Sequence, residues 1–237
     1  MKISITGVTG LVGSHLVKLL SVPNADGSTN DIKALIREDS IVDHLKTYED
    51  VDYVIGGLED KESLQQLVEG SEALIHLAHF PGPAKTEDEY VTVNVNGSYD
   101  LLQAAKIAKV KQVVFMSACA VFGTIQPSVG ESSPLDESHP VQPSSLYGAI
   151  KSSIESFCFF YARNRAFDIT ILRPVTIYGV RPDLPKSEWF ETVDFLSTNY
   201  NVDVKGSTKY VSIDAVCQAI TKVLGNREAS GEIYHLI

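Results

Sequence analysis

The sequence has few cysteines, and its basic residues are outnumbered by acidic ones. The three cysteines, Cys119, Cys158 and Cys217, form no CxxC pair and no even-numbered disulfide framework. Buried thiols in a reducing cytosol are therefore expected. Twenty Lys and Arg against thirty Asp and Glu give a net charge of −10. Nucleic acid is then an unexpected partner, because phosphate backbones are bound by Lys and Arg. An anionic ligand would need a local binding device.

Long apolar runs are also missing. No window approaches the roughly 18 consecutive apolar residues of a membrane span. Residues 1–13, MKISITGVTGLVG, lack the apolar stretch and cleavage site of a signal peptide. We therefore expect a cytoplasmic protein with no membrane partner. The hydrophobic share of 44% and the charged share of 21% are those of an ordinary globular chain.

Short apolar runs rich in β-branched residues alternate with segments of helical period. The predicted strands cover residues 2–6, 32–36, 52–55, 73–77, 113–116, 169–172, 210–213 and 232–236. The predicted helices cover residues 11–20, 61–68, 90–108, 145–166, 187–196 and 214–224. Parallel neighbours need crossover connections, so this alternation predicts an α/β fold with a doubly wound parallel sheet, the Rossmann arrangement. The proline-rich residues 124–144 predict a long irregular loop.

A glycine-rich turn follows the first predicted strand. TGVTGLVG places Gly7, Gly10 and Gly13 between that strand and the first helix. The three positions serve a tight turn, close backbone approach to a pyrophosphate, and close packing of helix on sheet. Free N–H groups and the helix dipole can then bind an anion without net positive charge on the protein. This motif predicts a dinucleotide-binding domain over residues 1–173.

The end of the second predicted strand bears on the choice of cofactor. An acidic side chain there binds the ribose 2′-hydroxyl of NAD, and a basic one the 2′-phosphate of NADP. Here ALI is followed by Arg37. We therefore favour NADP. NAD remains the alternative, because Glu38 and Asp39 adjoin Arg37 and could bind a ribose.

A tyrosine and a lysine stand one helical turn apart. In YGAIK, Tyr147 and Lys151 are at i and i+4 and leave one helix face. A cation beside a tyrosine favours tyrosinate, so Lys151 is expected to lower the pKa of Tyr147 toward a working range. Tyr147 is the candidate acid/base, and Lys151 could also hold a ribose hydroxyl.

The motifs together resemble one family over nearly the whole chain. The matching stretches are TGVTGLVG, LIHLAH, NVNGS, MSACAVFG, YGAIK, LRPVTIYG and KYVSIDAV. The sequence is similar to extended short-chain dehydrogenase/reductases of the NAD-dependent epimerase/dehydratase family. The resemblance implies hydride transfer to or from a small alcohol, carbonyl or sugar-type substrate, with Tyr147 and Lys151 as catalytic residues. The cofactor-binding residues that we expect are Gly7, Thr9, Gly10, Leu11, Val12, Gly13, Arg37, Leu58, Ala78, His79, Asn94, Ser117, Tyr147, Lys151, Pro174 and Val175.

Two positions depart from the family pattern. A Ser or Thr usually stands five residues before the glycine that closes the fifth-strand motif, and it binds the reacting carbonyl. Counting back from Gly123 gives Ala118. Ser117 is one residue away and should point to the opposite face of the strand. The second departure is Gly57, where an acid commonly precedes the adenine-lining Leu58. Ser132, Ser133 or Thr176 could supply the missing hydroxyl. Ala118 also supports an alternative, a dinucleotide-binding sensor or interaction protein with little turnover.

The remaining expectations concern partners and the second half of the chain. Phe157, Phe159, Phe160 and Tyr161 follow YGAIK and favour a helix-on-helix homodimer. No metal site is expected, since the HxxH spacing of residues 76–79 has no further ligands nearby. Residues 174–237 would form a shortened substrate-binding part that also contributes a late strand and helix to the fold. A small lid favours a smaller substrate or a more open cleft.

Overall fold

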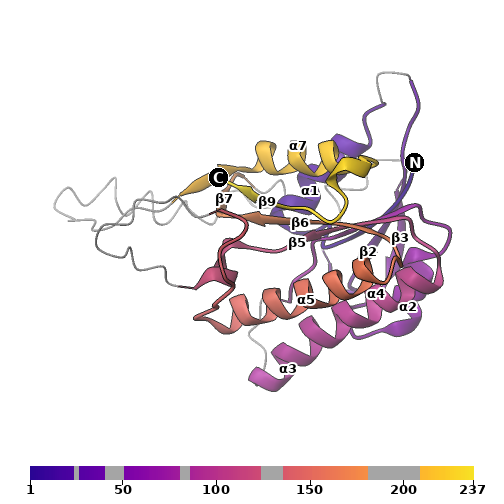
Figure 1. Cartoon of the computed structure of the whole chain (residues 1–237). Coiled ribbons are helices and arrows are strands. Elements are labelled where there is room, and N and C mark those ends of the chain that lie inside the picture. Colours follow the sequence, from indigo (N-terminus) through magenta and orange to yellow (C-terminus); the bar gives the residue numbers. More distant parts are fainter. Residues whose placement is uncertain (24–26, 41–50, 81–85, 124–135, 181–208) are drawn as a thin grey trace, which may run out of the picture.

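A parallel sheet of seven strands forms the centre of the molecule. Figure 1 shows the computed structural model, which describes residues 1–23, 27–40, 51–80, 86–123, 136–180 and 209–237. The strands are β1 (Lys2–Thr6), β2 (Asp31–Ile36), β3 (Val51–Ile55), β4 (Ala73–His76), β5 (Gln112–Met116), β6 (Asp168–Pro174) and β9 (Ile233–Leu236). Their spatial order is β3-β2-β1-β4-β5-β6-β9, and every neighbouring pair is parallel. The predicted doubly wound fold is confirmed.

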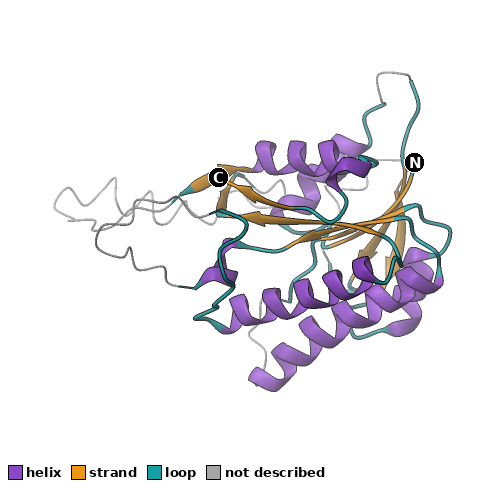
Figure 2. Ribbon diagram, viewed as in Figure 1, coloured by secondary structure: helices purple, strands orange, loops and turns teal. Residues whose placement is uncertain are grey.

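Helices cover both faces of this sheet (Figures 1 and 2). On one face lie α1 (Leu11–Leu20) and α7 (Ile213–Val223), which pack against each other. On the other lie α2 (Lys61–Val68), α4 (Gly97–Ile107) and α5 (Leu146–Arg163). Each face has its own apolar core, and the central strands β1, β4, β5 and β6 are buried between them. This explains their nearly continuous apolar sequences, because a parallel strand covered on both faces has no solvent-facing side.

The predicted helix over residues 90–108 is wrong in detail. It consists of α3 (Glu87–Val91), a π-helical turn (Thr92–Asn96) and α4. At the junction with α4, a Cβ on Gly97 would come within 2.6 Å of the Leu58 carbonyl oxygen, so glycine permits that loop to approach. Such π turns often occur at functional sites. Here the turn carries Asn94.

The second half of the chain returns to the main sheet. After β6, strand β7 (Thr176–Tyr178) pairs in parallel with β8 (Tyr210–Ser212), and α7 follows β8 directly. Strand β9 then pairs with β6.

The predicted helix over 187–196 and residues 124–135 of the predicted loop lie outside the described residues. The domain boundary after residue 173 stays a prediction. In the described part of the chain, none of the helices has the length and apolar character needed to span a bilayer.

Candidate functional site

The glycine turn at the carboxyl end of β1 is tightly packed. Gly7 has a φ of 79°, and a Cβ there would lie 2.8 Å from the Ala78 backbone nitrogen. A Cβ on Gly13 would lie 2.2 Å from the Gly7 carbonyl oxygen. Positive φ and these approaches both demand glycine. The turn therefore brings α1 against the sheet and brings the segment after β4 against the turn.

The start of α1 is open to an anion. Gly10 is its N-cap, no side chain caps it, and its first turn has no acidic residue. A Cβ on Gly10 would meet only the Gly7 carbonyl oxygen, at 3.3 Å, so its outer side is free. Helix N-termini carry unsatisfied N–H groups and a positive partial charge. Backbone groups can thus bind an anion in a chain whose net charge is −10.

Two cavities of about 330 and 590 Å³ meet over this turn. They share four lining residues, Gly7, Gly10, Leu77 and His79. A dinucleotide has two nucleotide halves joined by a pyrophosphate, and cavities on both sides of a helix N-terminus match that shape. The residues present therefore fit a nicotinamide dinucleotide, with its pyrophosphate at Gly10.

The predicted cofactor residues are distributed between these cavities. Those lining only the smaller cavity are Thr9, Arg37, Leu58 and Ala78. Those lining only the larger one are Leu11, Val12, Gly13, Ser117, Tyr147, Lys151, Pro174 and Val175. Gly7, Gly10 and His79 line both, and Asn94 lines neither. The smaller cavity lies beside the ends of β2 and β3, and the larger one beside β5, α5 and β6.

The smaller cavity also has polar residues that sequence reasoning missed. Ser40 lines it, and its Oγ accepts a hydrogen bond from the Arg37 backbone N–H at 3.0 Å. Glu59 lines it too, and a Cβ on Gly57 would lie 2.2 Å from the Glu59 carboxylate. A neighbouring carboxylate thus lies beside Gly57, where the expected acid is absent. The Arg37 Nε donates to Asp39 at 3.2 Å in an exposed ion pair.

Tyr147 and Lys151 project from α5 into the larger cavity. The Lys151 ammonium is buried and donates to the Met116 carbonyl oxygen at 2.8 Å. Burial lowers the Lys151 pKa to about 8, although Glu155 opposes this shift. Burial, with Tyr90 adding to it, raises the Tyr147 pKa to about 12. The expected lowering of the Tyr147 pKa is therefore wrong for the chain alone, because Lys151, 5.8 Å from the Tyr147 ring centroid, does not outweigh desolvation.

Asn94 braces the segment after β4. Its Oδ1 accepts from the Phe80 N–H at 2.8 Å, and its Nδ2 donates to the Phe80 and Tyr90 carbonyl oxygens at 3.2 and 2.9 Å. Asn94 is 1% exposed. It therefore holds the backbone beside His79, and its side chain is fully used within the protein.

His76 belongs to a buried neutral network beneath the same segment. Ser98 donates to the Asn94 carbonyl at 2.6 Å, so it accepts from His76 Nε2 at 2.9 Å. His76 Nδ1 then accepts from the Thr6 hydroxyl at 2.8 Å, whose oxygen accepts from the Ala78 N–H at 3.1 Å. Burial, followed by Lys151 and His79, lowers the His76 pKa to about 3.

No group of three or more potential metal ligands occurs in the described ranges.

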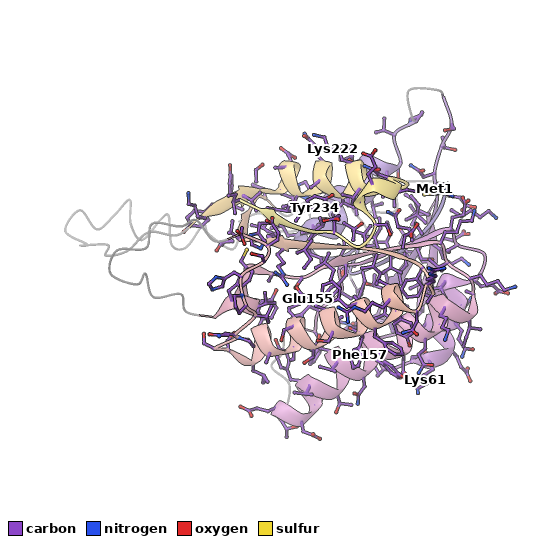
Figure 3. All side chains as sticks on the ribbon, viewed as in Figure 1. Met1, Lys61, Glu155, Phe157, Lys222 and Tyr234 are labelled. Atoms are coloured by element: carbon purple, nitrogen blue, oxygen red, sulfur yellow. The ribbon has the colours of Figure 1, made fainter. Side chains whose placement is uncertain are left out.

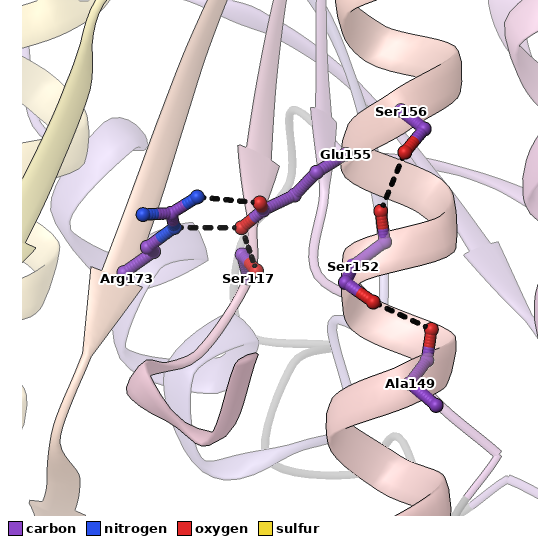
Figure 4. Close-up of polar contacts among 6 residues, drawn as sticks. All are labelled: Ser117, Ala149, Ser152, Glu155, Ser156 and Arg173. Carbon is purple, nitrogen blue, oxygen red and sulfur yellow. Dashed lines mark hydrogen bonds and ion pairs between the residues drawn. The ribbon is translucent and has the colours of Figure 1, made fainter. Parts of the chain in front are cut away.

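Ser117 belongs to a second, charged network (Figure 4). Its hydroxyl donates to Glu155 Oε1 at 2.5 Å, while Arg173 Nε and Nη2 donate to the two Glu155 oxygens at 2.9 and 2.7 Å. All three side chains are buried. Figure 3 labels Glu155 on α5, on the side that faces the sheet. Sequence reasoning missed this network, although Glu155 continues the i, i+4 series of Tyr147 and Lys151.

The hydroxyl missing at Ala118 is not supplied by its neighbours. Ser117 is committed to Glu155, as expected for a side chain on the opposite face. Cys119 Sγ donates to the Arg173 carbonyl oxygen at 3.2 Å. Thr176 lines the larger cavity. Ser132 and Ser133 lie outside the described residues.

The comparison with known protein families agrees with this geometry. The pattern of the NAD dependent epimerase/dehydratase family matches residues 3–236. The chain belongs to this family. It is accordingly an enzyme of a family that uses nicotinamide dinucleotides, and the predicted resemblance is confirmed.

Individual relatives of the epimerase/dehydratase family span several reactions. A probable UDP-glucuronate 4-epimerase from Rhizobium meliloti is 28% identical and aligns over 94% of this chain and 68% of its own length. A quinoline-oxide ketoreductase from Stigmatella aurantiaca is 26% identical and aligns over 100% of this chain and 68% of its own length. The crystal structure of a dTDP-glucose 4,6-dehydratase from Streptomyces venezuelae with NAD superposes with a TM-score of 0.80, at 27% identity, over 100% of this chain and 75% of that one.

Proposed function

We propose that the chain is an NAD(P)-dependent oxidoreductase or epimerase/dehydratase-like enzyme that acts on a small alcohol, carbonyl or sugar-type substrate. The observation that carries this proposal is the meeting of two cavities over the glycine turn, with Tyr147 and Lys151 in the larger one. That cavity, of about 590 Å³, has room beside a nicotinamide for a small substrate. The named relatives include enzymes of sugar nucleotides, which supports the sugar-type class.

The residues of the larger cavity have distinct roles in this proposal. When bound, a nicotinamide dinucleotide supplies or accepts the hydride at a substrate carbon. Tyr147 gives its hydroxyl proton to the oxygen on that carbon in a reduction, or removes it in an oxidation. A Tyr147 pKa of about 12 keeps the proton on the chain before the cofactor binds. Lys151 holds ribose hydroxyls, and its buried charge stabilises the tyrosinate that forms.

The test compares Tyr147→Phe with Tyr234→Phe, a control on β9 outside both cavities. NADPH binding is followed by fluorescence, and turnover is screened with UDP-glucuronate, UDP-glucose and small ketones. We expect Tyr147→Phe to lower kcat about 10²- to 10⁴-fold with little change in the Kd for NADPH, because a general acid is lost. Undiminished turnover in Tyr147→Phe would remove its catalytic assignment.

Ala118 favours a second candidate, a dinucleotide-binding sensor of little turnover. With alanine at position 118, the site lacks one hydrogen-bond donor to the reacting carbonyl. Such donors contribute about 3 to 4 kcal/mol to transition-state stabilisation. Tight NADPH binding without turnover across the substrate screen, in the presence of an intact Tyr147, would favour the sensor.

NADP is the cofactor that we favour over NAD. Arg37 and Ser40 line the smaller cavity beside the end of β2, where a 2′-phosphate would lie. The Arg37 guanidinium is exposed, and among the described residues its ion pair is with the exposed Asp39, so it can turn toward a phosphate. We expect Arg37→Ala to weaken NADPH binding much more than NADH binding, and Arg227→Ala, a distant exposed control, to change neither. Equal weakening of NADPH and NADH binding would overturn the assignment of Arg37 to the 2′-phosphate.

The assembly and location in this proposal rest on surface features. Phe160 on α5 is 55% exposed and Tyr99 on α4 is 37% exposed. The ring of Phe157, which Figure 3 labels, lies 5.1 Å from that of Tyr99 between centroids. These aromatics support a homodimer through α4 and α5, which sedimentation of wild type and Phe160→Asp would test.

The three cysteines are free thiols, which supports a reducing cytoplasm. Residues 174–237 would contribute the substrate-binding part.

A further inference from the structure

His79 stands where the two cavities meet. It follows β4 by three residues and lines both cavities. Its Nε2 lies 2.6 Å from the Tyr90 hydroxyl. Its Nδ1 is buried and has no hydrogen-bond partner within the described ranges. Buried polar atoms are nearly always satisfied, and of the three unsatisfied buried nitrogens among the described residues, that of His79 belongs to a residue that lines both cavities, so it calls for an explanation.

The contact of His79 with Tyr90 favours one tautomer of the His79 ring. Burial and the Lys151 charge lower the His79 pKa to about 4, so the ring is neutral and carries one proton. Burial raises the Tyr90 pKa, so that side chain is a phenol with a proton to donate. A phenol donates well to an unprotonated imidazole nitrogen, and on this ground we assign Nε2 as the acceptor. The single ring proton then lies on Nδ1.

His79 is also close to the candidate acid. Its ring meets the Tyr147 ring edge-on, with 4.8 Å between centroids. The cavity that contains both rings also contains Ala118, where the hydroxyl that usually polarises the carbonyl is missing. In that cavity Lys151 donates to Met116 and Cys119 to Arg173. His79 therefore brings an unused donor to the neighbourhood of Tyr147.

We propose that His79 is a further catalytic residue, whose Nδ1–H donates a hydrogen bond to the substrate oxygen that receives the Tyr147 proton. It would replace the hydroxyl absent at Ala118. This inference rests on the proposed function. In a reduction by NADPH, the C=O π bond breaks, the carbon gains the hydride and the oxygen gains the Tyr147 proton. The tyrosinate is reprotonated from water, and His79 keeps its proton throughout.

Matched variants separate the two nitrogens of His79. Gln places its amide near the position of Nε2 and so keeps the Tyr90 contact without a donor at Nδ1. Asn places its amide near Nδ1. With NADPH and 9,10-phenanthrenequinone as the probe carbonyl, we expect kcat of His79→Gln to fall about 10²-fold, as for loss of an oxyanion-type donor. The kcat of His79→Asn should fall less than that of His79→Gln. Ala118→Ser, added to His79→Gln, should restore at least a tenth of the wild-type kcat.

A readout without turnover completes the test. In the NADPH complex labelled with ¹⁵N-histidine, the His79 resonances should show a protonated Nδ1 and an unprotonated Nε2, and His79→Gln identifies them. An Nε2–H tautomer overturns the proposal, as does wild-type kcat in His79→Gln. The kcat of Thr176→Val could also fall as far as that of His79→Gln, with Ala118→Ser failing to restore the kcat of His79→Gln. That result would assign the donor to Thr176 and would also overturn the proposal. Failure to bind both NADPH and NADH rejects the proposed function, whereas normal binding with the wrong tautomer rejects only this inference.

Discussion

Two buried polar networks support the two sides of the cleft, and only one of them is charged. The neutral network joins Thr6, His76 and Ser98 across β1, β4 and α4. The charged network joins Ser117, Glu155 and Arg173 across β5, α5 and β6. All six side chains are at most 2% exposed. Equal burial therefore has different consequences, since an unpaired charge is far more costly to bury than an unpaired neutral group.

Each network fixes a different wall of the site. Through Ala78 and Asn94, the neutral network holds the segment that carries His79. The charged network ties the strand end before Ala118 to the helix that carries Tyr147 and Lys151. Local hydrogen bonds suffice for the first wall. The second wall needs an ion pair, which gives it a fixed geometry that depends on both partners.

Breaking the ion pair should have the largest effect. We expect Glu155→Ala to lower the free energy of unfolding by about 3 to 5 kcal/mol, because it leaves the Arg173 guanidinium buried and unpaired. Urea denaturation measures this loss. The double variant Glu155→Met/Arg173→Met should recover much of it, since no charge remains. A loss below about 1 kcal/mol in Glu155→Ala would place the pair with ordinary surface ion pairs.

The neutral network should respond to pH instead. The folded pKa of His76, about 3, lies below its unfolded value of about 6.5, so its contribution is complete above pH 6.5 and declines as pH falls toward 3. Between pH 6.5 and 5, His76 should account for a loss of about 2 kcal/mol in unfolding free energy. His76→Gln removes this slope, and denaturation curves at both pH values test it. Identical slopes in both proteins would show that His76 does not titrate in this way.

The smallest effects come from a matched pair of serines. Ser117→Ala removes a hydrogen bond to a carboxylate, whereas Ser98→Ala removes two neutral ones, with the His76 imidazole and with the Asn94 carbonyl oxygen. Hydrogen bonds to charged groups contribute about 1.5 to 3 kcal/mol, and neutral ones about 0.5 to 1.5 kcal/mol. Per hydrogen bond removed, we expect the thermal midpoint to fall further in Ser117→Ala. The reverse order would contradict the contrast between the networks.

The sheet could be predicted from sequence because burial on both faces leaves a local signature. Helices α1 and α2 begin and end where their periodicity does. The division of residues 87–107 into α3, a π turn and α4 could not be predicted, because it depends on contacts of Asn94 with Phe80 and of Gly97 with Leu58. These partners are distant in sequence.

The site was predicted where a motif is contiguous and missed where it is assembled by the fold. The glycine turn and YGAIK are local patterns. Glu59 and Ser40 are ordinary surface residues in sequence, and only the fold brings them to the smaller cavity. The Tyr147 pKa was predicted in the wrong direction because burial, which sequence does not show, outweighs Lys151.

The pairing of β9 with β6 has a consequence for synthesis of the chain. Residues 175–232 separate the two strands, so β6 is made long before its outer neighbour. Until β9 leaves the ribosome, the nascent sheet ends in an unpaired, apolar β6. Such an edge can pair with other chains, and chaperones that shield it during translation should raise the yield of correctly folded enzyme.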